Sequence, residues 1–338
     1  MYTDASGKKW FKGNIHTHTT RSDGRRSPEE VAELYRANGY DFLSLTDHWR
    51  VSETEVTKDG LLLLSGCEYD TGRNVRDGIF HITSLGCTET PKLERGADAR
   101  SIVNEIHRCG GIANLAHPAW SLNTCEQLLP VIDGRVVPLF GADVTEIYNS
   151  ASGLPKNCRP YSGIVIDQLA ARGAYLPLVA TDDTHWYESE ACMSYIMVQA
   201  EECTREAILS AIREGRFYAT QSPTLEITRD GDVINVACSP VESIVYYTDI
   251  VWCGHRADVG HGLTSSTFRF DSETFVRVEV TDASGRTAWS NIIGGGLRPQ
   301  TDIGGGLRPQ ADIGGGLRPQ ADIGGGLRPQ ADIGVREA

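Results

Sequence analysis

Between Trp10 and about Thr220, short apolar runs alternate with segments that have a helical pattern. The expected strands are Phe11–His18, Phe42–His48, Leu61–Tyr69, Phe80–Gly86, Ile112–His117, Val144–Asn149, Leu176–Asp182 and Tyr195–Gln199. The expected helices are Ser27–Asn38, Asp98–Cys109, Tyr161–Arg172 and Thr204–Glu214. Such alternation predicts parallel β-α-β units, and this many units indicate a closed β/α barrel.

Local signals mark the start of the first of these helices. Ser27 is a typical N-cap residue, Pro28 suits the first helical turn, and Glu29 and Glu30 place negative charge at the positive end of the helix.

The pattern changes twice after the barrel segment. Pro223 to Ile292 contains short strands, with Asp230-Gly231-Asp232 as a hairpin turn, which predicts a small, β-sandwich-like all-β appendage. From Gly294 a ten-residue unit, GGGLRPQTDI and then GGGLRPQADI, repeats with only Leu and Ile available for burial. We therefore expect a barrel domain at 1–221, the appendage at 222–293 and a disordered repeat tail at 294–338.

Composition excludes several classes of protein. The formal net charge of −13 disfavours binding to a nucleic-acid polymer, which needs a basic surface. No apolar run approaches the roughly 20 residues of a membrane-spanning helix, and the first residues do not resemble a secretory signal. The nine cysteines form no Cys-x-x-Cys pair and are interpreted as reduced thiols, so we expect a cytoplasmic location. The oligomeric state stays open.

Histidine and carboxylate residues gather at the ends of the expected strands. His16 and His18 are two residues apart, so both project from one strand face. The other candidates at or just after strand ends, or within a strand, are Asp23, His48, Glu68, His81, His117, Asp183 and His185. Six of nine histidines fall in such positions, and the strand ends of a parallel barrel open onto one rim. Imidazoles and carboxylates at this density suit Zn, Mn or Fe ions.

Other residues receive weaker assignments. Asp47 and Asp182 each precede a candidate ligand and are interpreted as supporting groups. Arg21, close to Asp23, is a candidate to clamp a phosphate, with a solvated loop arginine as the alternative. Packing is the expected role of Trp120, Tyr148 and Asn149, and Arg159 is left outside the site.

The motifs N-I-H-T-H-T-T-R-S-D-G, L-T-D-H, G-C-E, L-A-H-P and T-D-D-T-H resemble, in this order, those of the PHP (polymerase and histidinol phosphatase) metalloesterases. The resemblance covers roughly residues 10–220 and implies a distorted seven-stranded, TIM-like β/α barrel with two or three divalent transition-metal ions. It implies one ion held by His16, His18, Glu68 and Asp183, a second by Glu68, His81 and His117, and a third by Asp23, His48 and His185. Asp23 stands where some relatives have His. The C-terminal strands resemble the stand-alone branch that includes carbaryl-hydrolase-like enzymes.

The expected reaction is hydrolysis of a small phosphomonoester or phosphodiester, nucleotide-like or sugar-like, by a hydroxide that bridges two ions. His185 would protonate the leaving oxygen if the third ion is absent. Hydrolysis of a carboxyl ester, carbamate or amide uses the same ions and stays open as an alternative. A non-catalytic metal-binding module is a third interpretation.

Overall fold

The computed structural model describes residues 1–4, 6–252 and 255–294. The repeats from residue 295 onward, for which a disordered tail is expected, lie outside the described residues. Within the described part of the chain, no helix is long and apolar enough to cross a membrane.

The larger of two main sheets has 13 strands among the described residues. Its order is β15 (Leu225–Asp230), β16 (Val233–Thr248), β18 (Phe275–Thr281), β19 (Thr287–Trp289), β14 (Phe217–Thr220), β13 (Tyr195–Gln199), β2 (Lys9–Asn14), β3 (Phe42–Ser44), β5 (Leu62–Leu64) and β4 (Glu55–Val56). Three further strands pair at its sides, β1 (Tyr2–Thr3) with β2, β17 (Ala257–Arg269) with β16, and β20 (Ile293–Gly294) with β18. Strands β2, β3 and β5 are mutually parallel, as expected for β-α-β units.

The second sheet has the order β12 (Leu178–Thr181), β11 (Val144–Asn149), β8 (Ile112–Leu115), β7 (Ile79–Leu85) and β6 (Gly66–Gly72). A separate hairpin is formed by β9 (Val131–Ile132) and β10 (Arg135–Val136). The expectation of parallel strands throughout is wrong for two of the expected strands, because β13 runs antiparallel to β2 in the larger sheet and β7 runs antiparallel to both β6 and β8 in this one. No helix separates β6 from β7, so the chain turns back directly as a hairpin. The expected single strand Leu61–Tyr69 is likewise split into β5 and β6, which belong to different sheets.

Two isolated parallel bridges connect the sheets beyond their regular strands. Thr17, after β2, pairs with Thr184, after β12, and His48, after β3, pairs with Glu68 on β6. The strands themselves form a mixed α/β fold of two sheets with no closed barrel among the described residues, so the seven-stranded barrel stays a prediction. The bridges nevertheless bring the ends of β2, β3 and β12 close to β6, where the candidate ligands lie.

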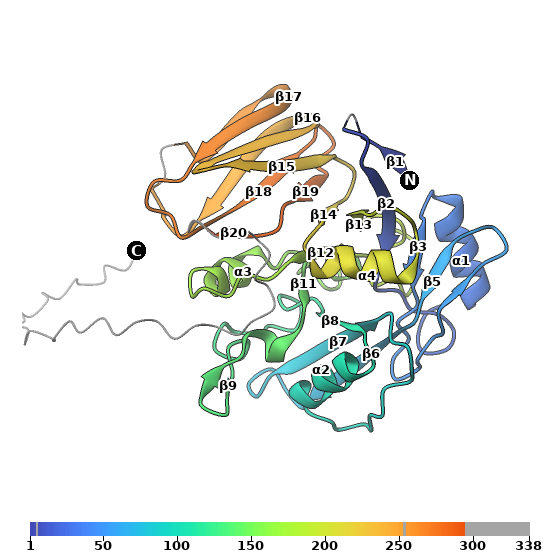
Figure 1. The fold of residues 1–338 in the computed structure, drawn as a ribbon. Coiled ribbons are helices and arrows are strands. Elements are labelled where there is room, and N and C mark those ends of the chain that lie inside the picture. The colour runs from blue at the N-terminus through green and yellow to red at the C-terminus, as the bar shows by residue number, and fades with distance from the viewer. Residues whose placement is uncertain (5, 253–254, 295–338) are drawn as a thin grey trace, which may run out of the picture. The chain divides into compact units, whose positions relative to one another are not determined.

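Four α-helices cover these sheets in the described residues: α1 (Pro28–Ala37), α2 (Ala99–Arg108), α3 (Gly163–Ala170) and α4 (Arg205–Arg213) (Figure 1). Two short 3-10 turns, η1 (Pro138–Gly141) and η2 (Ala151–Gly153), flank β11. The helix start predicted at Ser27 is confirmed, since its side chain accepts from the Glu30 amide while the Glu30 side chain accepts from the Ser27 amide. Asp98 and Thr204 cap α2 and α4 with their side chains alone, which accept from the amides of Ser101 and Ala207.

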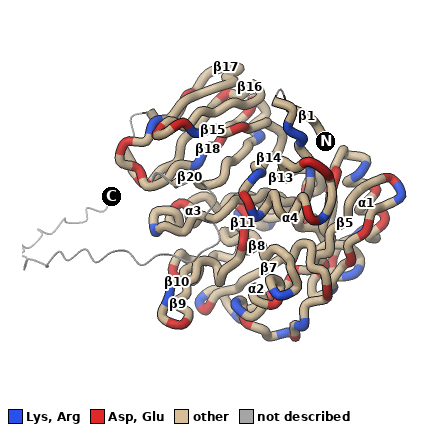
Figure 2. Tube along the Cα trace, in the orientation of Figure 1, with Lys and Arg blue, Asp and Glu red and all other residues tan. Residues whose placement is uncertain are grey.

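The apolar interior draws on both sheets. One cluster combines Phe11 and Phe42 of the larger sheet with Leu85 and Val144 of the smaller sheet and with Ile208 of α4. Acidic and basic residues are interspersed along α1 and α2 on the outside (Figure 2). The interior is therefore packed with side chains, and the polar site lies at the ends of the strands.

The C-terminal strands continue the larger sheet, because β19 pairs with β14 on one side and with β18 on the other. The hairpin predicted at Gly231 is confirmed, with φ of +57° at this glycine between β15 and β16. Short strands were expected throughout this region. The structure instead has one long strand, β16, whose register shifts twice between Ala237 and Ser243. The domain boundary expected at residues 221 and 222 stays a prediction.

Candidate metal centre

Four side chains form a central group at the ends of the strands. His16 and His18 follow β2, Glu68 lies on β6 and Asp183 follows β12, and all four are buried. The Nε2 atom of His16 lies 3.2 Å from Glu68 Oε2 and 3.2 Å from Asp183 Oδ1. The Nε2 atom of His18 lies 3.0 Å and 3.1 Å from the same two oxygens. Two imidazoles and two carboxylates therefore point at one position.

These converging atoms fit a bound cation. The Nε2 atoms of His16 and His18 and the Oδ1 atom of Asp183 are buried without a hydrogen-bond partner, which is costly for a polar atom. Four donors bonded at 2.0–2.1 Å to a tetrahedral zinc ion would lie about 3.3 Å apart, close to the 3.0–3.2 Å separations of the central group. A divalent ion would satisfy all three atoms and offset the two carboxylate charges.

Glu68 also belongs to a second group, with His81 and His117. Its Oε1 atom lies 2.7 Å from His81 Nδ1 and 3.5 Å from His117 Nε2, whereas its Oε2 atom faces the central group. His81 is near the start of β7, and the reversed direction of this strand brings its beginning to the ends of the others. The ring of Trp120 packs in an edge-to-face arrangement against His81 and His117, and its centroid lies 5.7 Å from that of His81 and 5.0 Å from that of His117.

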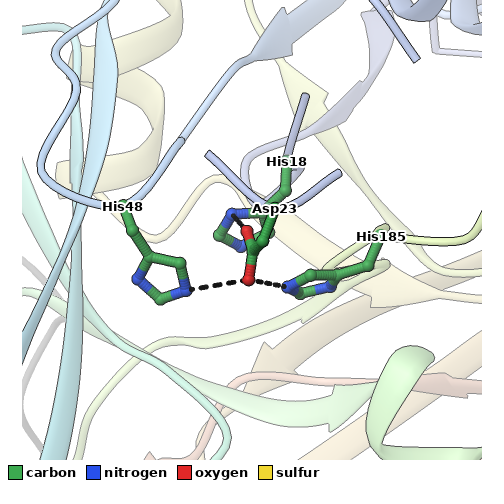
Figure 3. A group of neighbouring side chains, drawn as sticks. All are labelled: His18, Asp23, His48 and His185. Carbon is green, nitrogen blue, oxygen red and sulfur yellow. Dashed lines mark ion pairs between the residues drawn. The ribbon is translucent and has the colours of Figure 1, made fainter. Parts of the chain in front are cut away.

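A third group consists of His18, Asp23, His48 and His185 (Figure 3). Asp23 Oδ2 lies 3.4 Å from His185 Nε2 and 3.8 Å from His48 Nε2, and Asp23 Oδ1 lies 3.5 Å from His18 Nδ1. A neutral imidazole has only one nitrogen with a free lone pair, so it can bind one ion. The Nε2 atom of His18 faces the central group, so His18 would bind the ion there and not the ion of the third group. Asp23, His48 and His185 then remain for a third ion. Asp23 is half exposed, so this group is the most open of the three.

Local backbone geometry places these residues. A Cβ atom at Gly24 would lie 2.5 Å from the carbonyl oxygen of His18, so only glycine permits the turn that brings Asp23 to the site. His117 and Asp183 both have positive φ, 29° and 53°, which is uncommon for residues with a side chain. The Asp183 amide donates to the carbonyl of His16 at 2.9 Å, which fixes the two ligands relative to each other.

Burial and the neighbouring charges determine the protonation of the central group. Burial alone lowers the pKa of His18, but the facing carboxylates of Asp183 and Glu68 outweigh it and raise this pKa to about 10. Burial raises the pKa of Glu68, but His16 and His81 hold it well below its ordinary value. For His48, burial dominates and the pKa is lowered.

The supporting residues behave largely as expected. Asp47 accepts hydrogen bonds from the Thr19 amide and hydroxyl and from the Ser22 hydroxyl, and so organises the loop before Asp23. Asp182 accepts from the Tyr35 hydroxyl and from backbone amides of residues 192–194. Neither residue belongs to any of the three groups.

Sequence reasoning missed the buried acid Glu146 on β11. Its carboxylate accepts hydrogen bonds at the back of the central group, and Asn114 and Asn149 donate to it. The available signal was an acidic residue in the middle of the otherwise strand-like run V-T-E-I-Y-N. Asn149, assigned to packing, also lies 3.2 Å from Asp183 Oδ2. Tyr148 does pack, because its ring stacks on Trp289.

A cleft of about 540 Å³ opens above the groups. Its lining residues are Arg21, Ser22, Asp23, His48, Arg50, Asp70, His81 and Arg95. Arg21 therefore lines the cleft, while Arg159 does not. Arg50 and Arg95 were not predicted. Arg95 lies 3.9 Å from Asp70 and over the ring of Trp49. Three arginines thus line the same cleft as three of the candidate metal ligands.

Neither a protein-family model nor a curated protein matches the sequence. Among solved structures, a two-domain protein from Bacteroides vulgatus that contains a predicted PHP-like metal-dependent phosphoesterase has 16% identity and a TM-score of 0.49, over 87% of this chain and 98% of that chain. A protein from Bifidobacterium adolescentis, proposed to be a metal-dependent phosphoesterase, has 15% identity and a TM-score of 0.34, over 53% and 88% of the two chains. An amidohydrolase from Chromobacterium violaceum, with bound sulfate and no metal, has 16% identity and a TM-score of 0.35, over 53% and 89%.

A protein with a predicted PHP-like phosphoesterase thus occurs among the solved structures to which the chain is similar. The likeness to the carbaryl-hydrolase-like branch stays a prediction. Similarity at these TM-scores does not determine a reaction, which depends on the side chains described above.

Proposed function

We propose that this chain is a metal-dependent hydrolase of the PHP type that cleaves small phosphomonoesters or phosphodiesters, nucleotide-like or sugar-like. The proposal rests on one observation: metal-ligand atoms of His16, His18 and Asp183 converge in a buried group and have no hydrogen-bond partner. This group lies close to a cleft that is lined by three arginines.

The proposed ions are two or three divalent ions of Zn, Mn or Fe. His16, His18, Glu68 and Asp183 would hold the first, and His81 and His117 would hold the second together with Glu68. Asp23, His48 and His185 would hold a third. Bound divalent ions supply an activated water as nucleophile and neutralise charge that develops on the phosphoryl oxygens.

The protein's own side chains would bind and orient the substrate. Arg21, Arg50 and Arg95 line the cleft, and a guanidinium group matches two phosphate oxygens at once. His185 is held by its Nδ1 atom, 2.8 Å from the carbonyl oxygen of Asp183, so its Nε2 atom faces the cleft side. This atom would donate a proton to the leaving oxygen where no third ion is bound.

The test compares an aryl phosphate, a bis-aryl phosphate, an aryl acetate and an aryl carbamate on the metal-loaded enzyme. We expect the phosphoesters to react fastest. Arg21→Ala should raise KM for the preferred phosphoester about tenfold, the effect of losing one hydrogen bond to a charged group. Arg21→Lys should recover only part of this loss, because the forked contact is missing. Arg159→Ala, which removes an exposed arginine outside the cleft, is the matched control.

Two outcomes would replace the proposal. Faster turnover of the acetate or carbamate, unaffected by Arg21→Ala, would favour the carbaryl-hydrolase-like alternative. Tight metal binding without turnover of any of the four substrates would favour a non-catalytic metal-binding module.

A further inference from the structure

Glu146 is a buried, fully hydrogen-bonded carboxylate that contacts ligands of the first two groups, and none of the three groups includes it as a ligand. It lies on β11 with 0% exposure. Its Oε1 atom accepts from His16 Nδ1 at 2.7 Å and from Asn114 Nδ2 at 3.1 Å. Its Oε2 atom accepts from the His117 amide at 2.9 Å and from Asn149 Nδ2 at 2.9 Å. Each oxygen thus accepts two hydrogen bonds, so the carboxylate has no free lone pair with which to bind an ion itself.

We infer that Glu146 is a positioning residue that holds His16 and His117 in the arrangement that binds the first and second ions. The inference rests on the proposed function only in that the groups described above bind metal.

The contact with His16 fixes which ring nitrogen carries hydrogen. An ionised carboxylate only accepts hydrogen bonds, so the Nδ1 atom of His16 must be the donor. The lone pair of the neutral ring is then on Nε2, the atom that faces Glu68 and Asp183. A carboxylate behind a ligating imidazole also increases the basicity of the ring and fixes its orientation.

The second oxygen acts on the neighbouring group through the backbone. The amide that it binds belongs to His117, whose positive φ of 29° needs support from its surroundings. That backbone position directs His117 Nε2 to within 3.5 Å of Glu68 Oε1. Asn149 extends the connection, because its Nδ2 atom reaches both Glu146 and Asp183 Oδ2. One carboxylate therefore supports ligands of two different ions.

Glu146→Gln tests this role because it keeps the size of the side chain and removes the charge. The side-chain amide of this variant presents an NH₂ group to one of the two donor pairs. If this group faces His16, the ring must accept at Nδ1 and carry hydrogen on Nε2; if it faces the other pair, the amide of His117 loses its acceptor. Either arrangement weakens a ligand, and loss of such a partner costs about 10–100-fold in metal affinity.

The measurement is the dissociation constant of Zn²⁺ for the full chain, obtained by competition with a chromophoric chelator. The visible spectrum of the Co²⁺-loaded protein serves as a second readout of ligand geometry. For Glu146→Gln we expect a changed Co²⁺ spectrum and a loss of about 10–100-fold in affinity, at the first site if the NH₂ group faces His16 and at the second site if it faces the amide of His117. Glu279→Gln is the matched control, since it also neutralises a largely buried carboxylate but one that pairs with Arg277 on β18. It should leave both readouts unchanged.

A double variant separates positioning from general destabilisation. If Glu146 acts through His16, the loss of affinity in Glu146→Gln with His16→Ala should be close to that of His16→Ala alone. Additive losses at the first site would overturn the inference, as would wild-type affinity and spectrum in Glu146→Gln with only a lower melting temperature. If Glu146→Gln does not fold, Asn114→Ala is the alternative variant, because it removes a hydrogen-bond donor from the oxygen of Glu146 that also binds His16. We expect this variant to weaken the first site several-fold. An unchanged affinity would overturn the inference. Absence of Zn²⁺ binding by the wild-type chain would instead refute the proposed function itself.

Discussion

The affinity of the central group for metal should increase steeply with pH, because a metal ion must displace protons from its histidines. His18 has a pKa of about 10, since the carboxylates of Asp183 and Glu68 outweigh the effect of burial. At pH 7 the solution is about three pH units below this pKa, so removing the proton from His18 costs about 4 kcal/mol and lowers the apparent affinity for metal by roughly 10³. Each displaced proton should therefore increase the affinity about tenfold per pH unit between pH 7 and 9. The pKa of His16 is also raised above its ordinary value, so a second proton would double this slope on a logarithmic scale.

The folding stability of protein stripped of metal should respond to pH in the opposite direction. A histidine whose pKa is raised by folding stabilises the protein fully below its unfolded pKa of about 6.5. This contribution is lost as the pH rises through the folded pKa of about 10 for His18. The melting temperature of the stripped protein should fall over the window in which added Zn²⁺ gives an increasing stabilisation.

The assay is competition with a Zn²⁺ chelator at pH 7, 8 and 9, with proton release counted by calorimetry in buffers of different ionisation enthalpy. His261→Ala is the control, because this histidine is 98% exposed and lies outside the three groups. It should leave the slope unchanged. An apparent affinity that is constant or decreases between pH 7 and 9 would refute the reasoning.

Two substitutions test other parts of the structure. Glu68→Gln should reduce the number of bound ions by at least one in elemental analysis after dialysis, because one oxygen of Glu68 faces His16 and the other faces His81; an unchanged count would contradict the shared position of this carboxylate. Arg277→Ala should lower the free energy of unfolding by about 3–5 kcal/mol, the cost of leaving buried charges unpaired, because Arg277 is 1% exposed and pairs with Asp167 and Glu279. Chemical denaturation measures this loss, and a change below about 1 kcal/mol would show that solvent or repacking compensates for the missing arginine.

Local signals made part of the fold predictable from the sequence. The start of α1 follows from Ser27, Pro28 and Glu30, which act within one turn of the chain. The strands Val144–Asn149 and Tyr195–Gln199 are found at the predicted residues because each is a compact run with clear polar borders. The structure likewise brings the candidate ligands from His16 to His185 together at one end of the strands.

Features that depend on distant pairing were not predictable. The direction of β7 and the length of β16 depend on which strands pair with them. A single sequence does not reveal which strands pair. Arg50 and Arg95 reach the cleft because two separate loops meet there. The role of Glu146 was not predictable for a related reason. Its role depends on which side of β11 it faces and on the donors that surround it, and its neighbours in sequence do not reveal either.

The C-terminal strands contribute to the site through the strand that carries Glu146. Residues on a strand alternate between two faces, so Glu146 faces the histidines while Ile147 packs in an apolar cluster on the other side. That cluster also contains Leu178 of β12 and, from the C-terminal strands, Phe275 and Trp289.

The same strands that present Glu146 and lead to Asp183 are therefore packed directly against β18 and β19. The ion pairs of Arg277 on β18 with Asp167 on α3 add a polar connection to this contact. In physical terms, the region expected to be an appendage supplies apolar packing behind two strands of the candidate metal centre. The packing of the two strands that carry Glu146 and lead to Asp183 therefore includes residues after 222 as well as residues of the expected barrel segment.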